Sequence, residues 1–139
     1  MPFSIAADVP DPAELVELYR SVGWTAYTED PEKLVDAVNG SHTVLAARAE
    51  SGELIGLART ISDGHTIAYL QDILVAPAHH RRGVGGALLD EMLSRTQHIR
   101  QLVLLTDAED AQRAFYESRG FAETHDFAPH QLRSFVHIR

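Results

Sequence analysis

The chain has 139 residues, of which 45% are hydrophobic and 23% are charged, a balance typical of a globular domain and not of a disordered segment. It contains no cysteine, which excludes disulfides, thiolate zinc sites and cysteine nucleophiles. The 12 basic and 20 acidic residues give a net charge of −8, which disfavours nucleic acid and anionic membranes as partners. An anionic ligand must therefore be captured by a local cluster of donors.

The first twelve residues have neither the basic start nor the apolar stretch of a secretory leader, and no apolar run approaches the length of a membrane span. We therefore expect a cytoplasmic protein. Because no linker or repeat divides the sequence, we also expect a single domain over residues 1–139.

The first half of the chain predicts a strand, two helices and three strands. A proline beside an acidic residue opens each helix and a glycine ends it, while short glycine-containing turns separate the later strands. The predicted strands are 4–9, 42–49, 53–61 and 66–76, and the predicted helices are 11–22 and 30–39.

The second half predicts a helix over 82–97 and a compact apolar strand over 101–106. A further helix begins at Asp107 or Asp110 and ends at Arg119, and two closing strands follow over 121–126 and 131–138. This alternation of elements indicates an α/β or α+β domain with a mixed sheet.

The most informative segment is the basic, glycine-rich turn between Pro77 and the helix that follows it. The first N–H groups of a helix have no intrahelical partner, and the helix dipole makes that end partly positive. The glycines of the turn lack a Cβ that would keep a phosphate away from these groups, and Arg81 and Arg82 add positive charge. The turn therefore predicts a phosphate site, best suited to a diphosphate.

Other phosphate-binding signatures fit this turn less well. No Gly-Lys-Ser or Gly-Lys-Thr follows, and the dinucleotide fingerprint belongs early in a βαβ unit, whereas this turn lies past the middle of the chain. A glycine-rich helix start that only packs closely against the sheet remains the alternative.

Two segments carry a resemblance to a known family. Residues 75–89 resemble motif A of the GNAT superfamily of N-acetyltransferases, in which a strand and V-x-P precede Q/R-x-x-G-x-G/A, with His80 at the position of the usual Gln or Arg. Residues 111–121, AQRAFYESRGF, resemble motif B, F-Y-x-x-x-G-F, although Glu109 stands where an asparagine is common.

The resemblance covers most of the chain. It implies a GNAT-like mixed, mostly antiparallel central sheet of six to seven strands flanked by about four helices. It also implies acetyl-CoA as the donor and CoA as a product. The cofactor-binding residues that it implies are Leu74, Val75, His80, Arg81, Arg82, Gly83, Val84, Gly85, Gly86, Ala87 and Phe115.

Transfer of an acetyl group to an amine needs stabilisation of an oxyanion and a proton for the leaving thiolate. The family pattern assigns the first role to the backbone N–H of Val75. Tyr116 is the candidate general acid, since a phenol with a pKa of about 10 can protonate a thiolate whose acid has a pKa of about 8.5. The alternative is that Tyr116 only packs on the sheet.

The acceptor amine must also lose a proton, and Asp72 is the only carboxylate on the predicted strand 66–76. Strict alternation turns Asp72 away from Tyr69 and Gln71, so only a bulge would bring it to their side. The alternative is a carboxylate bonded to Arg59, His65 or a backbone N–H.

The acceptor is expected between the first two helices and the sheet, where Trp24 and Tyr27 suit an amine-bearing small molecule. Together with Tyr69 and Gln71 they form the predicted substrate-binding set, and anchoring of the loop by the aromatic residues is the alternative. A protein N-terminus or lysine is the other acceptor considered, and a non-catalytic acyl-CoA-binding module is the other class of function.

Two further expectations concern metals and assembly. The eight histidines include no pair with helical metal-ligand spacing, so no metal site is expected. Because GNAT domains often pair through their last strands, a homodimer through Phe135, Val136 and Ile138 is expected.

Overall fold

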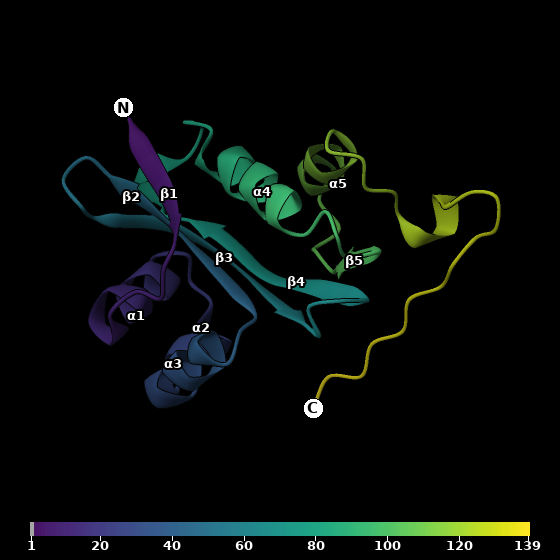
Figure 1. The fold of residues 1–139 in the computed structure, drawn as a ribbon. Coiled ribbons are helices and arrows are strands. Elements are labelled where there is room, and N and C mark those ends of the chain that lie inside the picture. The colour runs from purple at the N-terminus through teal and green to yellow at the C-terminus, as the bar shows by residue number, and fades with distance from the viewer. Residues whose placement is uncertain (1) are drawn as a thin grey trace. The chain divides into compact units, whose positions relative to one another are not determined.

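The computed structural model describes residues 2–139 and contains two compact units, one ending at Leu105 and the other beginning at Thr106. The first unit holds a five-stranded sheet in the order β1-β2-β3-β4-β5 (Figure 1). The strands are β1 (Phe3–Ala7), β2 (Thr43–Ala49), β3 (Leu54–Ser62), β4 (Ile67–Val75) and β5 (Gln101–Leu104). Neighbours from β1 to β4 are antiparallel, whereas β5 runs parallel to β4.

Helices cover both faces of this sheet. On one face lie α1 (Pro12–Ser21), α2 (Thr25–Thr28) and α3 (Pro31–Asn39), and on the other lies α4 (Val84–Arg95), which connects β4 to β5 (Figure 1). The crossover through α4 explains the parallel pairing, because parallel strands cannot be joined by a tight turn. The mixed, mostly antiparallel GNAT-like sheet flanked by helices is therefore confirmed for this unit.

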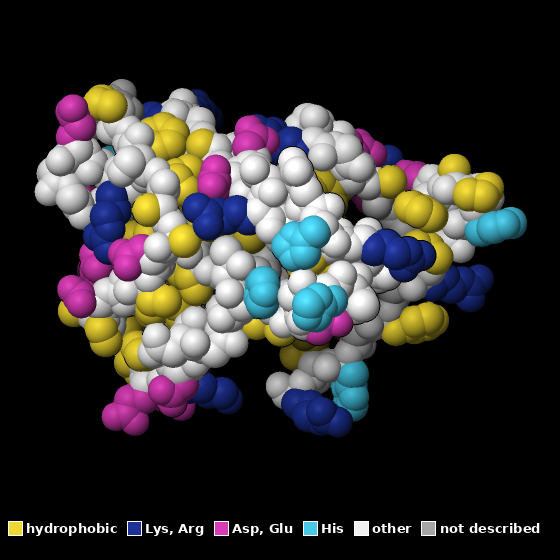
Figure 2. Space-filling model, viewed as in Figure 1, with side chains coloured by type: hydrophobic (Ala, Val, Ile, Leu, Met, Phe, Trp, Pro, Cys, Tyr) yellow, Lys and Arg dark blue, Asp and Glu magenta, His cyan; other side chains and the backbone are white. Residues whose placement is uncertain are grey.

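The main core lies between the sheet and the first helices. Apolar residues spaced three and four apart on α1 and α3 form one buried stripe on each helix and pack on the inward-facing residues of the strands. The cluster includes Leu15, Leu18, Tyr19, Leu34, Val38, Val44, Leu57 and Leu74. Acidic side chains remain on the outer surfaces of α1 and α3 (Figure 2).

On the opposite face, Gly56 of β3 allows α4 to approach the sheet closely. A Cβ at Gly56 would lie only 3.1 Å from side-chain carbons of Val84 and Leu88. This close packing fixes the beginning of α4, and with it the glycine-rich turn, against the central strands.

The elements next to the turn begin and end at other residues than the sequence predicts. Helix α4 begins at Val84 and not at Arg82, because Gly83 adopts a left-handed conformation with φ of 81° at the N-cap. A 3-10 turn over Pro77–His79 and the one-turn helix α2 were not predicted, since segments of three and four residues carry no periodic pattern.

The second unit contains α5 (Asp110–Glu117) and a 3-10 turn over Thr124–Asp126. The prediction of two closing strands over 121–126 and 131–138 is wrong, because no strand occurs between residues 106 and 139. Around the first segment, Arg113 forms ion pairs with Glu123 and Asp126, which are compatible with a turn and not with an extended strand. In the second segment the apolar side chains lie exposed, Phe135 at 88%, without the partner strand that a ladder needs. The sheet thus has five strands and not six to seven.

Within residues 2–139, none of the helices has the length and hydrophobicity needed to cross a lipid bilayer.

Candidate active site

The glycine-rich turn presents backbone donors at the start of α4. His80, Arg81, Arg82 and Gly83 are exposed, and the first hydrogen bond of the helix runs from the Ala87 N–H to the Gly83 carbonyl at 3.0 Å. The N–H groups of Val84, Gly85 and Gly86 precede this bond and have no carbonyl one turn earlier to bind. Together with the positive end of the 12-residue helix they form an anion-binding surface.

Arg81 has an unusual backbone in this turn. Its φ of 63° lies in the left-handed region, which a residue with a Cβ enters at a cost of about 1–2 kcal/mol. The Arg81 side chain is exposed, three residues before the first of these donors in the chain. Strain of this kind is frequent at binding sites, where the fold keeps a residue in a conformation that binding requires.

The second feature of the site is an open edge on β4. Its pairing with β5 ends at Leu70, so Gln71–Val75 face no strand of the described chain on that side. The Ala76 N–H donates to the Ile55 carbonyl at 2.8 Å, and because backbone groups alternate along an antiparallel ladder, the N–H and carbonyl of Val75 point to the open edge. By the same alternation, the backbone N–H and carbonyl of Leu74 point toward β3. The Leu74 side chain belongs to the core.

The His80 side chain turns back to this edge. Its Nε2 lies 2.9 Å from the Val75 carbonyl oxygen, and because a carbonyl only accepts, Nε2 carries the proton and donates. His80 therefore ties the turn to the end of β4.

The third feature is a β-bulge at Gln71. Arg59 pairs with Asp72 and Thr60 with Leu70, which leaves Gln71 as the extra residue of β4. Because paired residues share a face and successive residues alternate, the bulge brings Asp72 to the same face as Tyr69. The predicted need for a bulge at Asp72 is confirmed.

Asp72 is buried and accepts three hydrogen bonds. Tyr19 Oη donates to Oδ2 and Tyr27 Oη donates to Oδ1, both at 2.8 Å, and Arg59 Nε donates to Oδ2 at 2.5 Å. Of the alternative partners that the sequence offers, Arg59 is the one that the structure shows. Both oxygens of the carboxylate are thus held by donors of the protein itself.

Burial and the neighbouring charges determine the protonation states of Arg59, Tyr19 and Tyr27 in this network. Burial by itself lowers the pKa of Arg59, but the charge of Asp72 and the hydrogen bond to it outweigh burial, so the pKa of Arg59 lies above its ordinary value. Burial and the negative charge of Asp72 raise the pKa of Tyr19, and they also raise the pKa of Tyr27 despite its bond from Gln71. Both phenols are therefore protonated at neutral pH and act as donors.

Three of the four residues predicted to bind the acceptor lie together at the bulge. Trp24 and Tyr27 have ring centroids 6.2 Å apart, and Gln71 Nε2 donates to Tyr27 Oη at 3.1 Å. Tyr69 lies on the same face of the sheet as Asp72, but within residues 2–139 it has no hydrogen bond or ring contact to Trp24, Tyr27 or Gln71. Tyr19 and Arg59 lie behind this group and bond to Asp72. The sequence offered Arg59 as a partner of Asp72, but it did not offer Tyr19. Counting outward from the turn at 62–64 does not place Arg59 opposite Asp72, because the bulge shifts the register of the two strands.

In the second unit, Tyr116 lies in an aromatic cluster. Its ring packs edge-on against Phe115 at 5.0 Å and Phe121 at 5.6 Å, and the guanidinium of Arg119 lies 4.8 Å from the Phe115 ring centre. Burial and the negative charge of Asp107 raise the pKa of Tyr116. Tyr116 is thus a protonated phenol at neutral pH, as a general acid must be.

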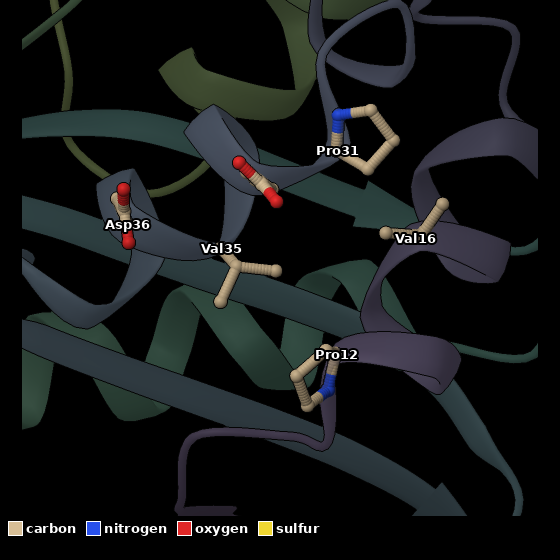
Figure 3. A pocket seen from close by; sticks show the side chains of 6 residues that line it. Pro12, Val16, Pro31, Val35 and Asp36 are labelled. Carbon is tan, nitrogen blue, oxygen red and sulfur yellow. The ribbon is translucent and has the colours of Figure 1, made fainter.

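Two other features do not include any predicted site residue. A shallow groove between α1 and α3 is lined by Pro12, Val16, Pro31, Glu32, Val35 and Asp36, and the side chains of Val16 and Val35 point into it (Figure 3). In the second unit Glu123, His125 and Asp126 have ligand atoms within 4.8 Å of one another, all of them exposed. Arg113 already pairs with both carboxylates of that group.

Comparisons with known proteins agree on one family. A family model described as an acetyltransferase (GNAT) domain matches residues 39–123. The chain is 30% identical over 125 residues to a candidate acetyltransferase of Gibberella zeae, covering 88% of this chain and 67% of that protein. It is 32% identical over 130 residues to a histone acetyltransferase of Glycine max, covering 86% of this chain and 54%, about half, of that relative. Among solved structures, a GNAT-family acetyltransferase of Streptococcus pneumoniae superposes with a TM-score of 0.84 at 25% identity, over 99% of this chain and 98% of that one.

Proposed function

Because the chain belongs to the GNAT family of acetyltransferases, we propose that it transfers the acetyl group of acetyl-CoA directly to a primary amine, on a small molecule. The observation that carries the proposal is the set of outward-facing donors at the start of α4 within a protein of net charge −8. An acidic surface repels a polyanionic cofactor, so these local donors must supply the attraction.

The turn fits the diphosphate of CoA. The N–H groups of Val84, Gly85 and Gly86 lie at the positive end of α4, Gly83 has open space where a Cβ would be, and Arg81 adds a guanidinium. Ala87 follows as the residue that closes the first helical turn. His80 contributes indirectly, because its side chain holds the turn to Val75.

Acetyl-CoA supplies a thioester whose carbonyl carbon the neutral amine attacks. The Val75 N–H, free on the open edge of β4, is the proposed donor to the developing oxyanion. Tyr116, kept protonated by its raised pKa, is the proposed donor of a proton to the departing thiolate. Asp72 is the carboxylate that the sequence offers as the base, but its oxygens are engaged by Arg59, Tyr19 and Tyr27, so the proton that the amine loses leaves through a chain of water molecules.

Two alternatives have specific support. The relative from Glycine max is named a histone acetyltransferase, which favours a protein lysine as the acceptor. His80 departs from the family motif and is turned toward Val75, which favours a module that binds acyl-CoA without turnover.

One experiment separates these functions. Free CoA released from acetyl-CoA is measured across a panel of small primary amines and lysine-containing peptides, with Tyr116→Phe as the variant. The proposal predicts release with small amines and a loss of about 10²–10³-fold in kcat for the variant. Release with peptides alone would favour the protein acceptor, and tight acetyl-CoA binding without release would favour the binding module.

We also propose that the protein forms a homodimer. Its cytoplasmic location stays a prediction from the sequence. The support is a run of exposed apolar side chains near the C-terminus, Phe135 at 88%, Val136 at 61% and Ile138 at 81%. Light scattering of Phe135→Asp beside the parent protein tests it: a dimer that the substitution splits agrees with the proposal, and a monomeric parent protein contradicts it.

A further inference from the structure

The segment α2, between α1 and α3, is too short to hold its own position. It has four residues, none of them buried, whereas isolated helices in water need about 12–15 residues to be stable. Something outside its backbone must therefore keep Thr25–Thr28 and the neighbouring Trp24 in place.

The contacts that do so converge on one side chain of α2. The Tyr27 ring centroid lies 5.1 Å from that of Tyr19, and the Arg59 guanidinium carbon lies 5.8 Å from the Tyr27 ring centre. At its tip, Tyr27 Oη donates to Asp72 at 2.8 Å and accepts from Gln71 at 3.1 Å and from Arg59 at 3.3 Å.

These three bonds fill the hydrogen-bonding capacity of the hydroxyl, which offers one donor and two acceptor positions. All three partners lie at the bulge: Gln71 is its extra residue, and Arg59 and Asp72 are the pair next to it. The hydroxyl therefore has no free position for a substrate, and its bonds instead join α2 to the bulge.

We propose that Tyr27 is a positioning residue, a clasp whose hydroxyl fixes α2 and Trp24 against the bulge of β4 and so sets the acceptor side of the active site. The inference rests on the proposed function for the identity of that side. Trp24 is 36% exposed, and Gln71 is exposed next to the open edge that holds Val75, so both are accessible to an approaching amine. The phosphate-binding turn shares no residue with this network.

Removing the hydroxyl while keeping the ring breaks all three bonds at once. Tyr27→Phe should therefore release α2 and weaken binding of the acceptor, while the affinity for acetyl-CoA stays unchanged. Tyr19→Phe is the matched control. It also removes one phenol that donates to Asp72 at 2.8 Å, but Tyr19 belongs to α1 and is buried in the core.

Hydrogen exchange of the Thr28 and Glu29 amides, whose bonds to Trp24 and Thr25 exist only while α2 is formed, gives a readout that does not depend on turnover. We expect exchange about tenfold faster in Tyr27→Phe and within about twofold of the parent protein in Tyr19→Phe. For an amine that is turned over, the KM of the acceptor should rise about fivefold in Tyr27→Phe alone, with the KM of acetyl-CoA unchanged.

Unchanged exchange in Tyr27→Phe, or equal acceleration in both variants, would overturn the clasp. So would a rise in both KM values together, because it would indicate a general loss of structure. If the parent protein acetylates no amine, the proposed function fails, and the exchange comparison still decides the clasp by itself.

Discussion

At the scale of single residues, Arg59 and Asp72 form a buried ion pair. Their side chains are only 5% and 3% exposed, and each charge is compensated mainly by the other. A buried pair of this kind adds little net stability relative to a well-packed apolar pair, but loss of one partner leaves an uncompensated charge in the interior.

Arg59→Met should therefore lower the free energy of unfolding by about 3–5 kcal/mol, and Arg59→Met combined with Asp72→Leu should recover most of that loss. Urea denaturation of the two variants and the parent protein measures both quantities. A double variant as unstable as the single one would show that the pair does not act through its charges.

Tyr116 gives a prediction for the pH dependence of the reaction. A general acid must be protonated, and burial and Asp107 raise the pKa of Tyr116 above its ordinary 10.0. The kcat of the parent enzyme should therefore show no decline from this group until above about pH 10. An alkaline decline centred near pH 8 that disappears in Tyr116→Phe would contradict the raised pKa of Tyr116.

Among the secondary-structure elements, α1 is fixed to the sheet at its first turn. Glu14 completes a capping box by accepting from the Asp11 N–H at 3.0 Å, and it pairs with Arg48 of β2 through two contacts of 2.7 and 2.9 Å. The hydrogen bond from Arg48, against a smaller opposing effect of burial, holds the pKa of Glu14 below its ordinary value of 4.5.

A lowered pKa in the folded state means that this stabilisation is complete above pH 4.5 and is lost as the pH falls through the folded pKa. Glu14→Gln should therefore cost about 1 kcal/mol at pH 7 and progressively less in acid. Thermal melts of both proteins from pH 7 to pH 3 test the sign, and a difference that grows in acid would contradict it.

The glycine-rich turn allows stability and binding to be separated. Asn enters the left-handed region at lower cost than Arg, so Arg81→Asn should leave the free energy of unfolding unchanged or raise it by up to about 1 kcal/mol. The same change removes a guanidinium and should weaken acetyl-CoA binding about tenfold. Calorimetry and urea denaturation on the same samples measure the two effects, and unaltered affinity would exclude Arg81 from the site.

Over the whole molecule, a net charge of −8 opposes the binding of an anionic cofactor that the turn attracts. Salt screens both the long-range repulsion between the acidic protein and CoA and the local attraction of CoA to the turn. The affinity for CoA should therefore change by less than about threefold between 50 and 300 mM NaCl. A steep loss of affinity in titrations at several salt concentrations would indicate a broad basic surface, which the composition excludes.

The sequence predicts the first unit well because its elements carry strong local signals. Proline and glycine mark the ends of α1 and α3, and apolar periodicity marks α4 and β2–β4. The closing strands were wrong because an alternating apolar pattern such as that of residues 131–138 indicates a strand only where a partner strand is available, and pairing is not a local property.

The candidate site was likewise predictable where it is contiguous in the chain and not where it depends on strand pairing. The phosphate-binding turn is contiguous in the chain, and both its glycines and its arginines are visible as a motif. The Asp72 network joins residues up to 53 positions apart, such as Tyr19 and Asp72, and depends on the register of β3 and β4. The sequence anticipated the bulge, from the conflict between strict alternation and an inward Asp72, and it offered Arg59 as one of several partners of Asp72.

The most direct measurement is an amide NMR spectrum of protein labelled with ¹⁵N only at its nine glycines. Addition of CoA should shift the signals of Gly83, Gly85 and Gly86 strongly and leave Gly40 and Gly52 in place, while pantetheine, which lacks the diphosphate, should not move the first three. Binding of CoA without any change at the three glycines, or equal shifts with pantetheine, would contradict a diphosphate site at the start of α4.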